Sequence, residues 1–278
     1  MQIVDLLPEG DPRVKNWGLM DSPAPTFLIV LAYLLIVVWW GRKVMARRTT
    51  GFSLQPLMLV YNFCMVLFSG WLWYEFCVAG WFGGGYTLGC QPVDRSRKPK
   101  AYRMARVCWF FFISKLVELL DTAFFIARRK FDQFSSQFFL DSRYRVIWME
   151  FQVALCVRVP SCGISTFHAM LNCFIHLLMY TYYGLAAAGP KFRRYIWWKK
   201  YLTTAQIIQF VVTILHSVYT LSLRDCNYPK LFNYWILSYA LIFLVLFANF
   251  YSHAYNKGMS VAGVHPIPMQ GRLGHKRD

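Results

Sequence analysis

The sequence predicts an all-α membrane protein with about seven transmembrane helices. Hydrophobic residues make up 57% of its 278 residues and charged residues only 15%, whereas charged residues make up about 25% of an average soluble domain. The charges gather in short clusters between apolar runs of about 20 residues, the length that a helix needs to cross a bilayer. The aromatic share of 19% excludes a disordered chain, and the low charge argues against an ordinary soluble enzyme.

Six apolar runs are long enough to cross a bilayer as helices. They are residues 22–41, 49–74, 107–127, 159–190, 201–223 and 231–256. A seventh candidate, 146–157, is short and contains Glu150. We count it as part of a spanning element because of the charge distribution described next.

Loop charge predicts the orientation, because cytoplasmic loops carry an excess of Lys and Arg. With seven spans, the basic loop after the first span, the basic loop 191–200 and the C-terminal tail all lie on the cytoplasmic side. With six spans, two of these three would be lumenal. The chain then divides into a lumenal N-terminal segment 1–21, a multi-span domain 22–256 and a basic cytoplasmic tail 257–278.

The formal net charge of +17 would suggest a nucleic-acid partner in a soluble protein. Here the basic clusters flank apolar runs, which is typical of topology signals and of contacts with anionic head groups. We therefore expect a lipid bilayer and no nucleic acid as partner. The segment 94–106 is an exception, since it is basic and yet predicted to be lumenal.

Two of the eight cysteines, Cys90 and Cys226, lie in loops that the seven-span topology places on the lumenal side. That compartment permits disulfides, so the sequence predicts a Cys90–Cys226 bond. Two unpaired loop thiols remain the alternative at this point. No CxxC pair is present, which argues against a zinc ribbon.

The third run contains three ionisable residues, Lys115, Glu118 and Asp121. Spacings of three residues place them within an arc of about 120° on one helix. Charges inside a membrane are expensive and therefore mark candidate functional sites. Two interpretations remain open: a polar or ligand-binding cavity, and a structural charge network that locks helices together.

The fourth run contains a second polar stripe, His168, Asn172, His176 and Tyr180, in which each member is four positions after the last, and Tyr183 continues it. Histidine suits nucleophilic or general-base chemistry near neutral pH, and Asn and Tyr can orient it by hydrogen bonds. The alternative is a stripe that hydrogen-bonds between helices. A weaker third set, Gln206, Gln209 and His216, lies on the following run.

We expect no metal site. His168 and His176 are eight residues apart, which corresponds to about 12 Å along a helix. Two ligands so far apart cannot share one ion without help from another helix. Neither HxxHH nor HExxH occurs in the sequence.

Several segments are similar to the family of very-long-chain fatty acid elongases, the condensing enzymes of the endoplasmic reticulum. They are DPRVKNW, DSPAPT, FFFISKLVELLDTAFFIARRK, TFHAMLNCFIHLLMYTYYGLAAAGPK, WWKKYLTTAQIIQF and DCNYPK. The resemblance covers most of the chain from Asp11 to about Tyr255. Gly18 is a minor departure, at a position where the family often has Pro.

The resemblance implies a multi-pass enzyme of the endoplasmic reticulum membrane, in which six of seven helices surround an acyl tunnel closed at its lumenal end. Such enzymes condense a long-chain acyl-CoA with malonyl-CoA and release CO2, CoA and a 3-oxoacyl-CoA for very-long-chain fatty acid synthesis. The acyl group passes through an enzyme histidine. We expect no cofactor besides these substrates, and other enzymes of the elongation cycle as possible partners.

The resemblance also implies roles for individual residues. His176, Asn172 and Tyr180 are expected to be catalytic. The residues expected to bind substrate are Lys115, Glu118, Asp121, His168, Tyr183, Gln206, Gln209 and His216, with Lys199 and Lys200 for the CoA phosphates.

One departure from the family is large. The family's diagnostic histidine box, HxxHH, lies on the fourth helix, and its flanks are present here at 128–133 and 165–172. Residues 134–164 between them contain no histidine. Three hypotheses remain open. The chain is an active elongase whose segment 134–164 arises from a reading-frame slip, a retained intron or a misassigned exon, or it is a catalytically impaired relative that binds acyl-CoA or elongation partners. The third is a seven-span transporter or receptor, which fits the span count but not the motifs.

Overall fold

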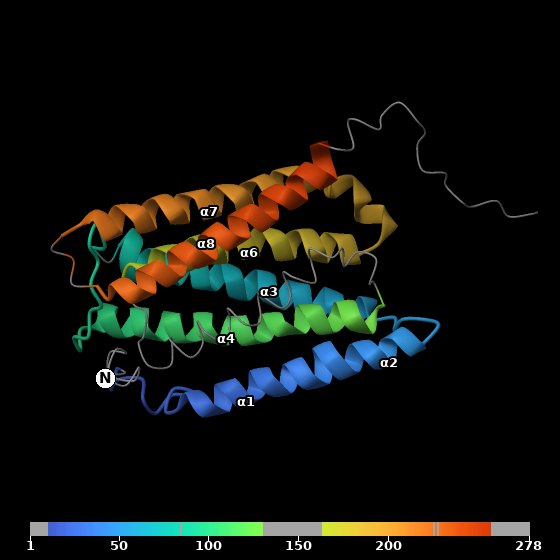
Figure 1. Ribbon diagram of the computed structural model, residues 1–278, viewed down its shortest axis with the longest axis horizontal. Helices are drawn as coiled ribbons and strands as arrows, with labels where there is room; N and C mark the ends of the chain where they lie inside the picture. Colours follow the sequence, from blue (N-terminus) through green and yellow to red (C-terminus); the bar gives the residue numbers. More distant parts are fainter. Residues whose placement is uncertain (1–10, 84, 130–162, 225, 227, 257–278) are drawn as a thin grey trace, which may run out of the picture.

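The computed structural model describes residues 11–83, 85–129, 163–224, 226 and 228–256. Every regular element in these residues is a helix, and the long helices run roughly along one axis (Figure 1). The predicted seventh span 146–157, most of the histidine-free segment 134–164, the tail 257–278 and the first ten residues lie outside the described residues.

The first element is one continuous helical rod from Pro23 to Arg47. It consists of α1 (Pro23–Tyr33), the π-helical η2 (Leu34–Gly41) and α2 (Arg42–Arg47). Ser22 caps its start, since its hydroxyl accepts a hydrogen bond from the Ala24 amide at 3.2 Å, and Pro23 suits the first helical position. The rod ends in the basic cluster that the sequence places at the membrane surface.

The remaining elements form the body of the bundle. They are α3 (Gln55–Phe76), η3 (Cys77–Trp81), α4 (Pro99–Ala127), α6 (Ser165–Ala187), η4 (Pro190–Tyr195), α7 (Lys199–Ser222), α8 (Lys230–Tyr251) and η5 (Ser252–Asn256). In Figure 1 the α1–α2 rod lies along one edge beside α4, and α7 and α8 lie at the opposite edge. Helices α3 and α6 lie side by side between them, and α7 packs on both α6 and α8.

Four helical segments of the described part are long and apolar enough to cross a membrane. They are Pro23–Arg47, Gln55–Trp81, Lys199–Ser222 and Lys230–Tyr255. Helices α4 and α6, which carry the charged and polar stripes, have 29 and 23 residues and lie in the same bundle. The prediction of an all-helical, multi-pass membrane protein is confirmed, and the count of seven spans stays a prediction.

Helix α4 begins eight residues earlier than the predicted span. It starts at Pro99 instead of Val107, since proline favours the first turn of a helix and the apolar pattern does not register the charged turns that follow. Most of the basic segment 94–106 is therefore helical, not loop. Arg103 pairs with Glu75 of α3 at 2.7 Å, which neutralises one charge of this segment.

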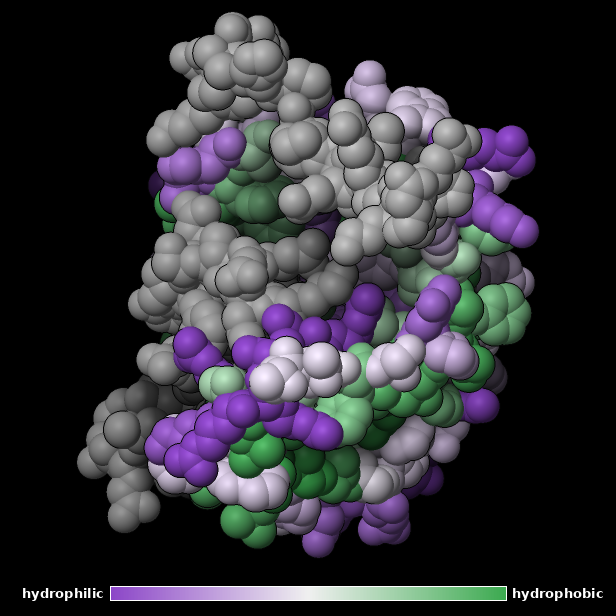
Figure 2. Space-filling model, turned by 90° about the vertical axis from the view of Figure 1, so that its right-hand side faces the viewer, coloured by the Kyte–Doolittle hydropathy of each residue, from purple (hydrophilic) through white to green (hydrophobic). Residues whose placement is uncertain are grey.

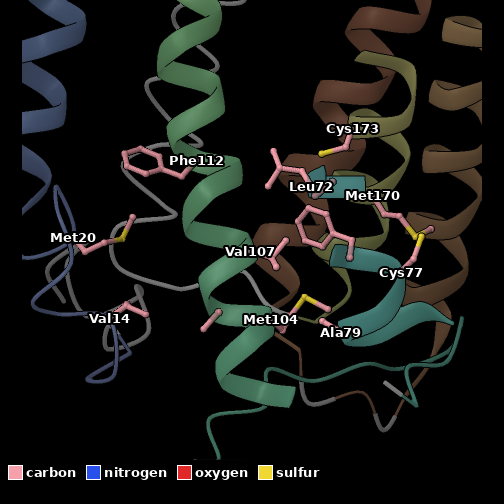
Figure 3. Close-up of a cluster of buried hydrophobic side chains, with 13 residues drawn as sticks. Val14, Met20, Leu72, Cys77, Ala79, Met104, Val107, Phe112, Met170 and Cys173 are labelled. Atoms are coloured by element: carbon pink, nitrogen blue, oxygen red, sulfur yellow. The ribbon is translucent and has the colours of Figure 1, made fainter. Parts of the chain in front are cut away.

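A hydrophobic cluster holds together the end of the bundle where the described chain begins (Figures 1 and 3). It joins side chains from four parts of the chain: Val14 and Met20 of the N-terminal segment, Leu72, Phe76, Cys77 and Ala79 of α3 and η3, Met104, Val107 and Phe112 of α4, and Met170 and Cys173 of α6. Arg13 bonds to Asp11 and donates to the Ser96 and Asp94 carbonyls at 2.6 and 2.9 Å. The N-terminal segment is thus anchored to the segment that precedes α4.

The same end of the bundle is closed covalently. Cys90 and Cys226 form a disulfide with a Cα–Cα distance of 5.3 Å, the pair expected from the sequence. Next to it the Ile164 amide donates to the Gln91 carbonyl at 3.0 Å. Gly163 has a φ of 119°, and a Cβ there would lie 2.6 Å from the same carbonyl, so a side chain at this position would separate the two segments. The α3–α4 connection, the start of α6 and the α7–α8 connection therefore meet at one point.

Candidate active site

Helices α4 and α6 bring the first two predicted polar sets together. Lys115 Nζ donates to Glu118 Oε1 and to Asn172 Oδ1, both at 2.7 Å. The first contact lies within α4 and the second crosses to α6. The side chains of Lys115 and Glu118 are only 13% and 14% exposed, so a buried ammonium and a buried carboxylate neutralise each other.

His176 shares the same carboxylate oxygen. Its Nδ1 lies 3.0 Å from Glu118 Oε1, and its side chain is 16% exposed. Glu118 therefore stands between a fixed positive charge and an imidazole. A carboxylate at Nδ1 favours the tautomer with its proton on that nitrogen, which leaves the Nε2 lone pair available.

Asp121 and Tyr180 form a second contact between the two helices, one turn further along each. The Tyr180 hydroxyl donates to Asp121 Oδ2 at 2.7 Å, and Tyr180 is completely buried. Tyr183 extends this row, with its ring centroid 6.2 Å from that of Tyr180. Residues spaced by four on α6 and by three on α4 thus pair with each other over two successive helical turns.

Sequence reasoning missed Tyr61 of α3. Its ring lies edge-on to Tyr180 with 6.0 Å between centroids, and its hydroxyl donates to the Val117 carbonyl of α4 at 3.4 Å. It therefore backs the Asp121–Tyr180 contact from a third helix. An aromatic residue in an apolar run does not stand out in the sequence as a candidate site residue. The one available signal was the adjacent Asn62, a polar residue in the same predicted span.

His168 faces α7 and α8 and does not join the α4–α6 contacts. His168 Nδ1 lies 3.4 Å from Thr213 Oγ1, and its ring lies 5.5 Å from that of Tyr239. His168 thus belongs to the same helical stripe as His176 but contacts a different helix, because positions eight residues apart differ by about 80° around a helix.

The three predicted residues of α7 occupy different depths. Gln206 Nε2 lies 3.9 Å from the sulfur of Met179, Gln209 is 5% exposed, and His216 lies between Trp81 and Phe167, with its ring 4.4 Å from Phe167. They form one polar line along the helix and not one cluster.

Lys199 and Lys200 are the first two residues of α7 and lie at the end of the bundle away from the disulfide. Lys200 Nζ is 5.7 Å from the Tyr251 ring of α8. Figure 2 looks onto this end, where hydrophilic side chains gather beside hydrophobic flanks. The position suits the binding of an anionic group that enters from this end.

The described residues contain no group of three His, Cys, Asp or Glu side chains that could hold a metal ion. The chemistry available between α4 and α6 is that of an oriented imidazole, a shared carboxylate, a buried ammonium and a buried phenol. Such a set can carry a nucleophile, hold its proton and stabilise charge nearby.

Comparison with known proteins gives a consistent result. The chain matches the family described as ELO: GNS1/SUR4 family over residues 18–262. It is 45% identical over 249 residues to very long chain fatty acid elongase 7 of Drosophila melanogaster, which covers 90% of this chain and 74% of that protein. It is 44% identical over 251 residues to very long chain fatty acid elongase 7 of Rattus norvegicus, covering 90% and 87%. A very long chain fatty acid elongase of Aedes aegypti is 44% identical over 246 residues, covering 88% and 67%.

Proposed function

This chain belongs to the ELO: GNS1/SUR4 family, and we propose that it performs the condensing step of fatty acid elongation. In this reaction a long-chain acyl-CoA and malonyl-CoA give a 3-oxoacyl-CoA, CO2 and CoA. A role in fatty acid elongation follows from the family. The reaction itself is supported by one observation above all: Glu118 Oε1 of α4 lies 2.7 Å from Lys115 Nζ and 3.0 Å from His176 Nδ1.

In the first half of the proposed reaction, His176 accepts the acyl group. The Nε2 lone pair attacks the thioester carbonyl carbon, the N–C bond forms and the C–S bond breaks. CoA leaves as the thiolate and takes a proton from solvent. The proton on Nδ1 passes to Glu118, whose oxygen lies 3.0 Å away, so the acylated imidazole is neutral.

In the second half, malonyl-CoA loses CO2, and the electron pair of the broken bond attacks the acyl carbon. The new C–C bond forms, the C–N bond breaks, and its electron pair returns to Nε2. Glu118 then returns the proton to Nδ1. The net reaction consumes one solvent proton and lengthens the acyl chain by two carbons.

The surrounding residues supply charge and orientation in this proposal. Lys115 balances Glu118 while the carboxylate is ionised, and Asn172 fixes Lys115 from the other helix. Asp121 fixes the Tyr180 hydroxyl one turn away. Lys199 and Lys200, at the end of the bundle, are placed to meet the CoA phosphates.

The proposal includes a location in the endoplasmic reticulum membrane, with the N-terminus lumenal and the C-terminus cytoplasmic. Two features support it. The disulfide lies at the end that the loop charges make lumenal, where thiols can be oxidised. The basic first turn of α7 lies at the other end, where CoA esters are found in the cytosol.

The test is condensation by the full chain in lipid nanodiscs, with labelled malonyl-CoA and a long-chain acyl-CoA. Substituting the nucleophile, His176→Ala, should lower kcat by about 10³-fold or more. The matched control is His253→Ala, since His253 is exposed on η5 and its Nδ1 lies 2.8 Å from the Asn249 carbonyl one turn earlier. Equal rates for both variants would exclude His176 as the acyl carrier.

The histidine-free segment favours a second candidate function, the binding of acyl-CoA without condensation. All six histidines lie at or after His168, and none lies in 134–164, where the resembling family has its histidine box. If the chain binds a long-chain acyl-CoA but releases no CO2 from malonyl-CoA, this second function is correct. Sequencing the transcript across codons 133–165 decides whether the segment itself is genuine.

A further inference from the structure

Gln209 is a buried donor whose hydrogen-bonding capacity the described residues leave unused. It is 5% exposed, and its Nε2 has no hydrogen-bond partner among the described residues. The Gln209 backbone carbonyl already accepts a hydrogen bond within α7, from Thr213 Oγ1 at 2.9 Å. An unpaired amide N–H inside a membrane bundle costs free energy, so the position of Gln209 indicates an acceptor from outside the described residues.

Two contacts place Gln209 at the depth of His176. Helices α6 and α7 run antiparallel; Gln206 meets Met179, and Thr213 meets His168. Gln209 lies between the two α7 positions, and therefore opposite the middle of the interval from His168 to Met179. That interval contains both Asn172 and His176. Since a helix rises about 1.5 Å per residue, Gln209 and His176 lie within about one turn of the same level.

The two residues also border the same interior. On α6, the side chains of His168 and Met179 reach α7, whereas Asn172 and His176 reach α4. Successive stripe positions are displaced by about 40° around the helix, so the sectors facing α7 and α4 are neighbours. A ligand atom bonded to His176 would thus have α4 on one side and α7 on the other.

We propose that the Gln209 carboxamide binds the carbonyl oxygen of the long-chain acyl thioester at His176. As Nε2 attacks, the carbonyl π electrons move to that oxygen, and the Gln209 N–H donates to it until the carbonyl re-forms and the thiolate leaves. Lys115 is less suited to this task, because its ammonium already bonds to Glu118 and Asn172. The inference rests on the proposed function and names the donor that this function requires.

The kinetic test replaces Gln209 with an apolar residue of similar length. Gln209→Met should lower kcat by about 10²-fold, and change the KM for acyl-CoA much less. Gln55→Met is the control for the same chemical change, since Gln55 is exposed at the start of α3 and its Nε2 donates to the Ala187 carbonyl at 3.0 Å. Its kcat should stay within about twofold of that of the unsubstituted chain. The Tm of Gln209→Met should equal or exceed that of the unsubstituted chain, because an unpaired buried donor is removed. A lower Tm with kcat unchanged per folded molecule would show that Gln209 is a structural bond, and would overturn the proposal.

A binding test separates this inference from the proposed function. Two non-cleavable probes are compared: a long-chain S-(2-oxoalkyl)-CoA, which has a carbonyl oxygen, and the matching S-alkyl-CoA, which has none. The unsubstituted chain and Gln55→Met should bind the oxo probe about tenfold more tightly than the alkyl probe, and Gln209→Met should bind both equally. If the chain shows no condensation but this preference holds and depends on Gln209, the proposed function fails and the donor assignment stands. If condensation occurs but Gln209→Met retains the preference, the donor assignment fails alone.

Discussion

The closed end of the bundle and the layer between α4 and α6 are held together by opposite kinds of contact. At the closed end, the hydrophobic cluster joins four parts of the chain, and a disulfide links two connections that are 136 residues apart in sequence (Figure 3). In the α4–α6 layer, three polar pairs join the helices: Lys115 with Asn172, His176 with Glu118, and Tyr180 with Asp121.

The difference supports the proposal that the closed end serves stability and the α4–α6 layer serves chemistry. Apolar packing and a covalent bond stabilise the fold without any charge to desolvate. Buried ion pairs, in contrast, recover their desolvation cost only when every partner is in place, and apolar residues of similar size often stabilise the same position better. A set of charges in the middle of a membrane bundle is therefore a sign of function, and the closed end is the frame that positions it.

After the loss of His176 itself, the largest effect should follow from removing the shared carboxylate. Glu118→Gln removes the proton acceptor of His176 and leaves Lys115 without its counter-charge. We expect kcat to fall by about 10²-fold. We also expect the free energy of unfolding to fall by about 3 kcal/mol, because a buried charge is left unpaired. Condensation rates and thermal unfolding in nanodiscs measure the two quantities.

A double substitution sharpens this test. Lys115→Met together with Glu118→Leu removes both charges and should restore the Tm while activity stays lost. The control is Glu75→Gln, since Glu75 pairs with the partly exposed Arg103 and should matter little to either quantity. Activity in the double variant would show that the charge pair is structural.

A smaller effect, on stability alone, is expected at the closed end. Cys90→Ser with Cys226→Ser should lower the free energy of unfolding by about 2–4 kcal/mol, because the cross-link restrains the unfolded chain. The condensation rate at a temperature where both proteins are folded should not change. Cys64→Ser, at an exposed free thiol, is the matched control. A loss of kcat at low temperature would mean that the disulfide positions the α4–α6 layer directly.

The smallest effect concerns Asp94, which lies before α4 and outside the spans. Partial burial raises the pKa of its carboxyl, but the hydrogen bonds from Ser96 and the charges of Lys98 and Arg13 outweigh burial, so the pKa lies below its ordinary value. A lowered pKa stabilises the fold above the ordinary value, and this contribution is lost as the pH falls through the lowered one. The Tm of the unsubstituted chain should therefore exceed that of Asp94→Asn at neutral pH, and the difference should shrink below about pH 4. A difference that persists at pH 3 would assign the effect to something other than the charge.

Much of the helical architecture could be predicted from hydropathy. The runs 201–223 and 231–256 match α7 and α8 with η5 to within two residues at each end, because apolar residues continue to the point where the chain turns. The run 107–127 was too short at its start, since Lys100, Arg103 and Arg106 lie on helical turns that a hydrophobicity pattern does not recognise. Helix ends depend on backbone capping and on polar contacts such as that of Arg103 with Glu75. A pattern of apolar residues does not register either of these.

The candidate site could be predicted residue by residue but not as an arrangement. Spacings of three and four residues place the polar side chains on one face of each helix, so the two stripes were visible in advance. Which stripe faces which was not visible. The structure directs Asn172, His176 and Tyr180 to α4, turns His168 toward α7, and adds Tyr61 from α3.

The sequence by itself determined that the chain is helical, lies in a membrane and holds an ionisable set in the middle of a span, because each of these properties depends on residue type and local spacing. Only the tertiary structure decided that Glu118 lies against both Lys115 and His176, and that the disulfide closes one end of the bundle. It also decided that Gln209 has a buried amide donor without a partner among the described residues. These depend on the rotation and relative depth of helices far apart in sequence. Periodicity within one helix carries no information about the rotation of its neighbour.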